Sequence, residues 1–121
     1  MATTARGDQV SQRQLKEYRL GNNRLAIGNY IGLAMKAGMV AAGDLAAKKS
    51  LTGGKVYLLV LAKDTSSTVI QQLTQMALQK SLPLLWWPDK NSLGQIVGKS
   101  LRGALAILDK GLSDAIINIC E

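Results

Sequence analysis

Two segments of this 121-residue chain carry residues suited to anion binding, and the first spans Met39 to Lys49 (MVAAGDLAAKK). Gly43 and Asp44 follow a short apolar run and precede an alanine-rich stretch that ends in Lys48 and Lys49. A strand end, a glycine turn and a helix N-terminus together favour anionic ligands, because the first N–H groups of a helix lack partners. The Asp44 carboxylate would compete for those N–H groups, so a capped helix that binds nothing is the simpler interpretation of this segment alone.

The second segment runs from Leu93 to Arg102 (LGQIVGKSLR). A short helix is expected to lead into Gly98 and Lys99, which are followed by the apolar Leu101 beside Arg102. Such a loop offers backbone N–H groups, two cations and an apolar contact to a ligand. Alone, the segment is equally well explained as a helix-to-strand connection with solvated charges.

Two further patterns are weaker. Asp64–Thr68 (DTSST) is expected to begin a helix after a strand and could hold a phosphate, although such hydroxyl clusters usually only cap. Trp86 and Trp87 are adjacent on an expected strand and therefore point to opposite faces. One ring would pack under a helix, and the other would either stack on a base or cover a neighbouring helix.

Composition limits the chemistry of the chain. It has no histidine and a single cysteine, Cys120, which excludes intrachain disulfides, Cys/His zinc sites and nucleophiles that need histidine. No glycine-rich nucleotide-binding motif follows a strand, so a phosphate-binding enzyme built on Asp64–Thr68 has little support. We expect no catalysis, no metal and no cofactor.

The charge balance points to a polyanionic partner. Lys and Arg number 15 against 8 Asp and Glu, and the excess lies in both the N-terminal region and the rest of the chain. This favours nucleic acid first and an acidic membrane surface second. No apolar run is long enough to span a membrane and no signal peptide is evident, so we expect a cytoplasmic protein.

Hydrophobic periodicity predicts helices that alternate with strands. The expected strands are Met39–Ala41, Val56–Ala62, Leu84–Trp87 and Ala104–Leu108, and the expected helices begin at Asn23, Asp44, Asp64–Thr68, Asn91/Ser92 and Gly111. This order predicts the α/β class, a three-layer α/β/α sandwich with a mixed sheet of about four strands, in a single domain over residues 23–121. Residues 1–22 are polar and are expected to form a flexible basic tail, either touching a polyanion or without a role.

In this order, the segments IGLAMKAGMVAAGDLAAKK, VYLLVLAKDTSS and LGQIVGK resemble the kink-turn RNA-binding ribosomal-protein family. This is the family of the L-seven-Ae and L-thirty-e proteins, and the chain is most similar to its small bacterial branch of YlxQ type. The resemblance implies a turn with Gly, an Asn-Glu pair and a Lys that bind RNA. Gly43 and Lys49 match this turn, whereas Leu45 and Ala46 replace the pair that hydrogen bonds to sheared G·A base pairs.

The resemblance also implies a second RNA-facing segment, which Leu93, Gly94, Gly98 and Lys99 match. It predicts a non-catalytic RNA-binding protein of ribosomal type that contacts structured, kink-turn-like RNA together with ribosomal or ribonucleoprotein partners. The predicted RNA-binding residues are Gly43, Lys48, Lys49, Leu93, Gly94, Gly98, Lys99, Ser100, Leu101 and Arg102. The alternative is a protein-interaction or assembly factor that kept the fold and lost base-specific RNA contacts.

Overall fold

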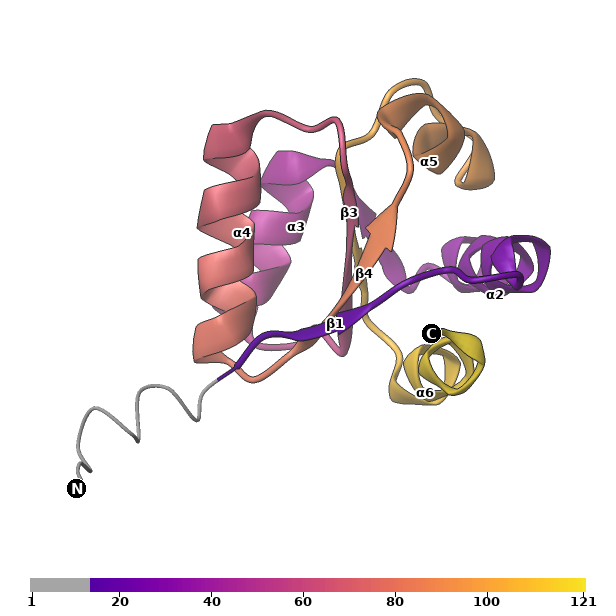
Figure 1. Cartoon of the computed structure of the whole chain (residues 1–121), viewed down its shortest axis with the longest axis horizontal. Coiled ribbons are helices and arrows are strands. Elements are labelled where there is room, and N and C mark those ends of the chain that lie inside the picture. Colours follow the sequence, from indigo (N-terminus) through magenta and orange to yellow (C-terminus); the bar gives the residue numbers. More distant parts are fainter. Residues whose placement is uncertain (1–13) are drawn as a thin grey trace.

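A five-stranded mixed sheet forms the centre of the structure, a computed structural model that describes residues 14–121 (Figure 1). The strands are β1 (Lys16–Tyr18), β2 (Val40–Ala42), β3 (Leu58–Ala62), β4 (Pro83–Trp87) and β5 (Ala104–Ile107). They lie in the order β1-β4-β3-β5-β2. Strands β1, β4 and β3 pair in parallel, and β5 pairs antiparallel with both β3 and β2.

Helices cover both faces of this sheet. Within residues 14–121 they are α2 (Arg24–Lys36), α3 (Asp44–Gly53), α4 (Ser67–Gln79), α5 (Lys90–Ile96) and α6 (Lys110–Ile119). Helices α3 and α4 lie on one face, and α2, α5 and α6 lie on the other (Figure 1). The predicted three-layer α/β/α sandwich is therefore confirmed.

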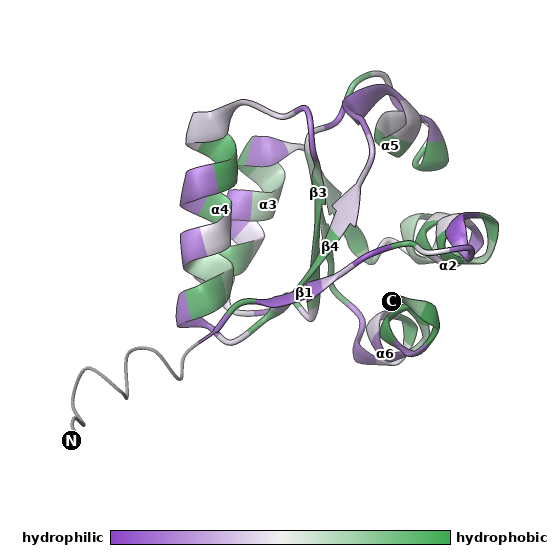
Figure 2. Ribbon diagram, in the orientation of Figure 1, coloured by the Kyte–Doolittle hydropathy of each residue, from purple (hydrophilic) through white to green (hydrophobic). Residues whose placement is uncertain are grey.

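Strand β3 is the centre of the core because its apolar run is continuous. All five of its residues are buried, and alternate side chains enter the two layers on either side. Leu58 and Val60 pack in the cluster shared with α2 and α6, whereas Leu59 and Leu61 pack in the cluster shared with α3 and α4. Figure 2 shows the hydrophobic colouring of the central strands between the helical layers.

Side-chain caps fix the starts of three helices, among them α4 and α6. Ser66, inside the predicted helix start, accepts a hydrogen bond from the backbone N–H of Val69 at 3.3 Å. Asp109 accepts one from the N–H of Leu112 at 2.8 Å, so α6 begins at Lys110, one residue earlier than predicted. Both caps satisfy N–H groups that would otherwise lack partners.

Strand β1 is the main departure from the prediction. We expected residues 1–22 to form a tail, but Lys16–Tyr18 pair with Pro83–Leu85 of β4. The sheet consequently has five strands rather than about four. Residues 1–13 of the predicted tail lie outside the described residues.

The segment after β1 also joins the domain. Leu20 is buried in the core, and the backbones of Arg19 and Glu121 exchange hydrogen bonds of 2.7 and 2.8 Å. A strand of three residues in a polar segment is too short for hydrophobic periodicity to reveal. Its pairing depends on the exposed edge of β4, which the local sequence does not encode.

The single thiol is expected to react slowly. Cys120 is half-buried beside the core, and this burial raises the pKa of its thiol from the ordinary 9.0 to about 11. The thiolate fraction near pH 8, and with it the rate of disulfide exchange, should be about a hundredfold lower in the folded protein than in the unfolded chain. Reaction with a chromogenic disulfide reagent in native buffer and in concentrated urea measures this ratio, and equal rates would contradict it.

The same pKa shift predicts a direction for stability at alkaline pH. The folded state keeps the Cys120 proton up to a higher pH than the unfolded state does. The contribution of the protonated thiol is therefore complete below about pH 9 and is lost as the pH rises toward about 11.

Candidate nucleic-acid interface

Several chain connections meet at one edge of the sheet. Strands β2, β3 and β4 end there and β5 begins there, as the pairing of Ala42 with Leu105 and of Leu61 with Ala104 requires. The turn after β2, the start of α5 and the loop before β5 surround a depression of about 650 Å³. The depression is lined by Ala42, Gly43, Asp44, Leu45, Ala46, Lys49, Lys90, Leu101, Arg102 and Gly103.

The β2–α3 turn depends on Gly43. Its φ of 112° lies in a region that side chains with a Cβ disfavour, and its N–H donates to the Ala104 carbonyl at 2.8 Å. Gly43 is also the N-cap of α3, so the prediction that Asp44 caps this helix is wrong. Asp44 is the first helical residue, and its carboxylate lies beside Gly103. No side chain among the described residues caps α3, so its first turn opens into the depression.

Two predicted RNA-binding residues shape the loop instead of presenting a surface. Leu93 is fully buried in the core. Gly94 is also buried, and a Cβ there would overlap the carbonyl oxygen of Ser100. The Gly94 carbonyl accepts a hydrogen bond from the Lys99 N–H at 2.9 Å, which holds the loop against α5. The structure therefore does not place the side chain of Leu93 where RNA could reach it.

Leu101 and Arg102 connect the loop to the turn. Leu101 is 58% exposed at the edge of the depression. The Arg102 side chain passes close to Gly43, where an added Cβ would lie 3.6 Å from its Cδ atom. Its guanidinium donates to the Leu101 carbonyl at 2.9 Å, which restrains the side chain near the turn.

The structure thus brings four of the predicted site residues together and leaves four others beside them. Gly43, Lys49, Leu101 and Arg102 line the depression. The exposed residues Lys48, Gly98, Lys99 and Ser100 are not among its lining residues.

Lys90 is a lining residue that the sequence analysis missed. Its N–H donates to the Asp64 carboxylate at 2.9 Å, and its carbonyl accepts from the Arg102 N–H at 3.1 Å. The start of α5 is fixed further by Asp89, whose pKa the Ser92 N–H lowers by hydrogen bonding to its carboxylate. The available signal was the position of Lys90, which is the first residue of the helix after β4 as Asp44 is the first residue of the helix after β2.

The hydroxyl-rich segment Asp64–Thr68 is already used within the fold. The Asp64 carboxylate accepts a hydrogen bond from the backbone N–H of Lys90, and the hydroxyl of the buried Thr65 donates to the Gly103 carbonyl at 3.2 Å. Ser66 caps α4. These contacts support the capping interpretation over a phosphate site.

The two tryptophans pack within the fold. Trp87 is buried, and its indole N–H donates to the Ser92 hydroxyl at 3.0 Å. The indole N–H of the half-buried Trp86 donates to the Glu17 carboxylate of β1 at 2.8 Å. Neither ring lines the depression.

Charge and apolar surface are combined in the depression. Its lining includes the cations Lys49, Lys90 and Arg102 against the single carboxylate of Asp44. Leu45 is 73% exposed there, so an apolar contact lies next to the cations. This arrangement suits an anion that also carries a flat or apolar group, as a nucleotide does.

Among residues 14–121, no group of three or more His, Cys, Asp or Glu side chains could hold a metal ion. None of the helices in this part of the chain is long and apolar enough to cross a membrane.

Solved structures with this fold include proteins from distant organisms. A Giardia lamblia 15.5kD RNA binding protein superposes with a TM-score of 0.70 at 21% identity, covering 82% of this chain and 87% of that one. A Bacillus halodurans protein superposes with a TM-score of 0.73 at 22% identity, covering 77% and 94% of the two chains.

Sequence comparisons agree with the resemblance found above. Large ribosomal subunit protein eL30 of Candida albicans is 32% identical over 99 residues, which cover 80% of this chain and 93% of the relative. The RNA-binding protein YlxQ of Bacillus subtilis is 25% identical over 91 residues, which cover 75% and 91%. A family profile matches residues 26–117. The chain therefore belongs to the ribosomal protein L7Ae/L30e/S12e/Gadd45 family.

Proposed function

We propose that this chain is a non-catalytic RNA-binding protein of ribosomal type, and that it works in the cytoplasm beside the ribosome. The observation that carries the proposal is the depression in which the uncapped start of α3 meets Lys49, Lys90 and Arg102. The relatives support it, because eL30 is named as a ribosomal subunit protein and YlxQ as an RNA-binding protein.

We expect the depression to bind RNA through both its charged groups and its shape. Lys49, Lys90 and Arg102 bind phosphates, while the N–H groups of the first turn of α3 donate hydrogen bonds to a further phosphate oxygen or to a carbonyl oxygen of a base. Leu101 packs against a base that has left its stack. Lys48 and Lys99 extend the positive charge along the RNA outside the depression.

Kink-turn recognition would take an unusual form in this chain. Leu45 and Ala46 occupy the first turn of α3, where the family carries an Asn-Glu pair. Their side chains cannot hydrogen bond to the sheared base pairs. We therefore expect binding to follow charge and RNA shape more than base identity.

Neutralising two lysines of the depression should weaken binding to folded RNAs broadly. Changing Lys49→Ala with Lys90→Ala removes about two phosphate contacts, so the slope of log affinity against log salt should fall by about two. Lys55→Ala with Lys80→Ala is the matched control, because it removes the same charge near a separate pocket, one that Lys80 lines. Titration of labelled RNA at several salt concentrations measures the slope, and equal slopes for the two double variants would refute this site.

Restoring the family pair should restore base-specific recognition. Leu45→Asn with Ala46→Glu should favour a kink-turn over a duplex of equal length by about 1–3 kcal/mol, because new hydrogen bonds form to the sheared pairs. Leu45→Glu with Ala46→Asn is the control, since it has the same composition and charge but reverses the two positions. A hundredfold kink-turn preference of the unmodified protein, about 2.7 kcal/mol, would contradict the loss ascribed to Leu45 and Ala46.

One observation favours the alternative of a protein-assembly factor. Leu45 is 73% exposed where the family carries a polar residue, and an exposed leucine suits a protein surface. If neither the kink-turn RNA nor the duplex RNA binds to the protein at any salt concentration, this alternative replaces the RNA-binding proposal.

A further inference from the structure

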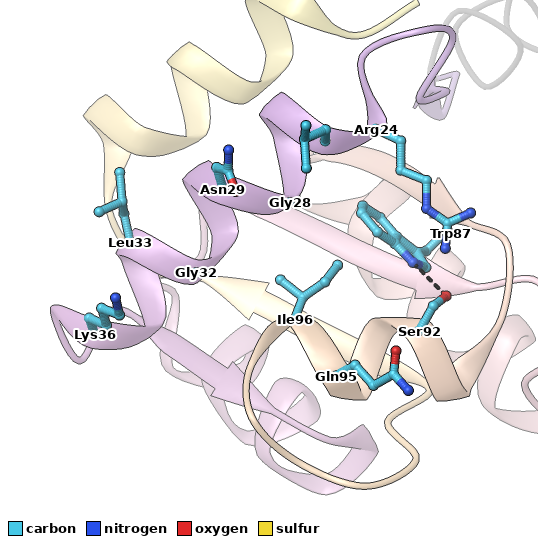
Figure 3. Close-up of a pocket in the computed structure, with 11 residues that line it drawn as sticks. Arg24, Gly28, Asn29, Gly32, Leu33, Lys36, Trp87, Ser92, Gln95 and Ile96 are labelled. Carbon is cyan, nitrogen blue, oxygen red and sulfur yellow. Dashed lines mark hydrogen bonds between the residues drawn. The ribbon is translucent and has the colours of Figure 1, made fainter.

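A second concave surface lies between α2 and α5, away from the depression (Figure 3). Its volume is about 690 Å³, and no residue lines both sites. We call it the α2–α5 groove. Helix α2 forms one wall with Leu25, Gly28, Gly32 and Leu33, and Ile96 of α5 stands on the other.

Two of the leucines that line the groove are exposed to solvent. Leu25 is 80% exposed and Leu33 is 54% exposed, and both line the groove. They are eight residues apart on one helix, a spacing that keeps side chains on neighbouring sides of it. Exposed aliphatic side chains around a groove are typical of a surface that docks an apolar face of another protein.

The charged side chains that line the groove are both basic. Arg24 is the first residue of α2 and Lys36 is the last, so the two cations stand about 18 Å apart along the helix. Both line the groove, and no acidic side chain of the described residues does. An occupant with carboxylates near its two ends would complement this surface.

The two glycines of the wall have no packing reason to be glycine. A Cβ at Gly28 would meet the Ile96 side chain at 3.8 Å, and one at Gly32 would meet the Ile96 carbonyl at the same distance. Both are ordinary van der Waals contacts, so alanine would fit. Glycine within a helix lowers its stability relative to alanine. The glycines therefore weaken α2 while keeping the groove open and the backbone of α2 accessible.

The lining suits a protein better than RNA. Unpaired bases bind by stacking on exposed aromatic faces. The one aromatic ring at the groove, Trp87, is 1% exposed and lies under the Arg24 guanidinium, 5.5 Å from it. Aliphatic side chains and glycines remain as the accessible apolar surface.

We propose that the α2–α5 groove docks an acidic, amphipathic helix of a partner protein. Leucines of the partner enter between Leu25, Leu33 and Ile96, and its carboxylates pair with Arg24 and Lys36. Helix α5 forms a wall of the groove, and its first residue, Lys90, lines the depression. A docked partner would thus lie beside bound RNA, although the groove does not depend on RNA binding.

The test is a phage-displayed library of helical peptides selected on the full-length protein, followed by affinity measurements on the wild type and on Gly28→Ala with Gly32→Ala. We expect enrichment of peptides that combine leucine with Asp or Glu. The double variant should melt at a higher temperature yet bind the enriched peptides about tenfold more weakly, because two methyl groups added to the α2 wall narrow the groove. Gly53→Ala is the matched control, since a Cβ there meets nothing within 4 Å, and it should bind like the wild type.

NMR chemical-shift mapping then locates the surface that the selected peptide binds. The selected peptide should shift the amide resonances of Gly28 and Gly32 and leave that of Gly43 in place. The proposal is overturned if no acidic peptide is enriched, or if the double variant binds as tightly as the wild type. It is equally overturned if oligo(U) RNA, or self-association of the protein, moves the Gly28 and Gly32 resonances.

Discussion

Replacing Val60 with Asp is expected to abolish folding. Val60 is fully buried at the centre of β3, between the pairing strands β4 and β5. A carboxylate at this position has no cation to pair with in its apolar cluster. Burying it would cost about 5 kcal/mol or more, which is comparable with the whole unfolding free energy of an ordinary domain.

Circular dichroism and thermal melting measure this effect. The wild type should unfold in one cooperative transition, and Val60→Asp should show none. Gln75→Asp introduces the same charge on the exposed side of α4 and should melt close to the wild type. A soluble Val60→Asp protein with a normal transition would show that β3 is not the core strand.

Removing β1 should have the second largest effect. A chain that begins at residue 23 loses the pairing of Lys16–Tyr18 with β4, the burial of Leu20 and the contact of Arg19 with Glu121. Burying one leucine contributes about 1.5–3 kcal/mol, and each net hydrogen bond contributes about 1 kcal/mol. We therefore expect the unfolding free energy to fall by about 3 kcal/mol or more.

The control for this truncation is a chain that begins at residue 14. Residues 1–13 are then absent from both proteins. Urea denaturation of the two chains gives the difference in unfolding free energy directly. Equal values would mean that β1 does not stabilise the domain, and that residues 14–22 behave as the tail that the sequence predicts.

Periodic patterns were sufficient to predict most of the fold. The apolar run of β3 and the helical spacing of α2 and α4 repeat over enough residues to identify each element from local sequence. Short connections between them then limited the topology to a layered α/β arrangement. Strand β1 was not predicted because its three residues carry no such repeat.

The candidate site was predicted only in part, because position and burial depend on tertiary contacts. Gly43 and Lys49 were found from the pattern of the turn that they share. Leu93 and Gly94 match the same family, but the packing of α5 buries them and gives them a structural role. Lys90 enters the site through its hydrogen bond with Arg102, a contact between residues that no local motif joins.

Asp44 at the β2–α3 turn illustrates the same limit. An Asp after a Gly predicts a side-chain cap, yet the positive φ of Gly43 makes the glycine itself the N-cap and leaves Asp44 beside Gly103. The start of α3 is therefore open toward Lys49, Lys90 and Arg102. The Asp44 carboxylate lines the depression but does not cap these N–H groups, so it does not compete with an anion for them.

The most direct test of the RNA-binding account is ultraviolet crosslinking of the full chain to RNA in cells. Mass spectrometry of the digested protein identifies peptides that carry a nucleotide, and sequencing identifies the RNA. The account predicts adducts within residues 43–49 and 99–103, together with one structured RNA recovered far above the background. Recovery of protein partners without RNA, or adducts confined to α4 and the opposite edge of the sheet, would contradict it.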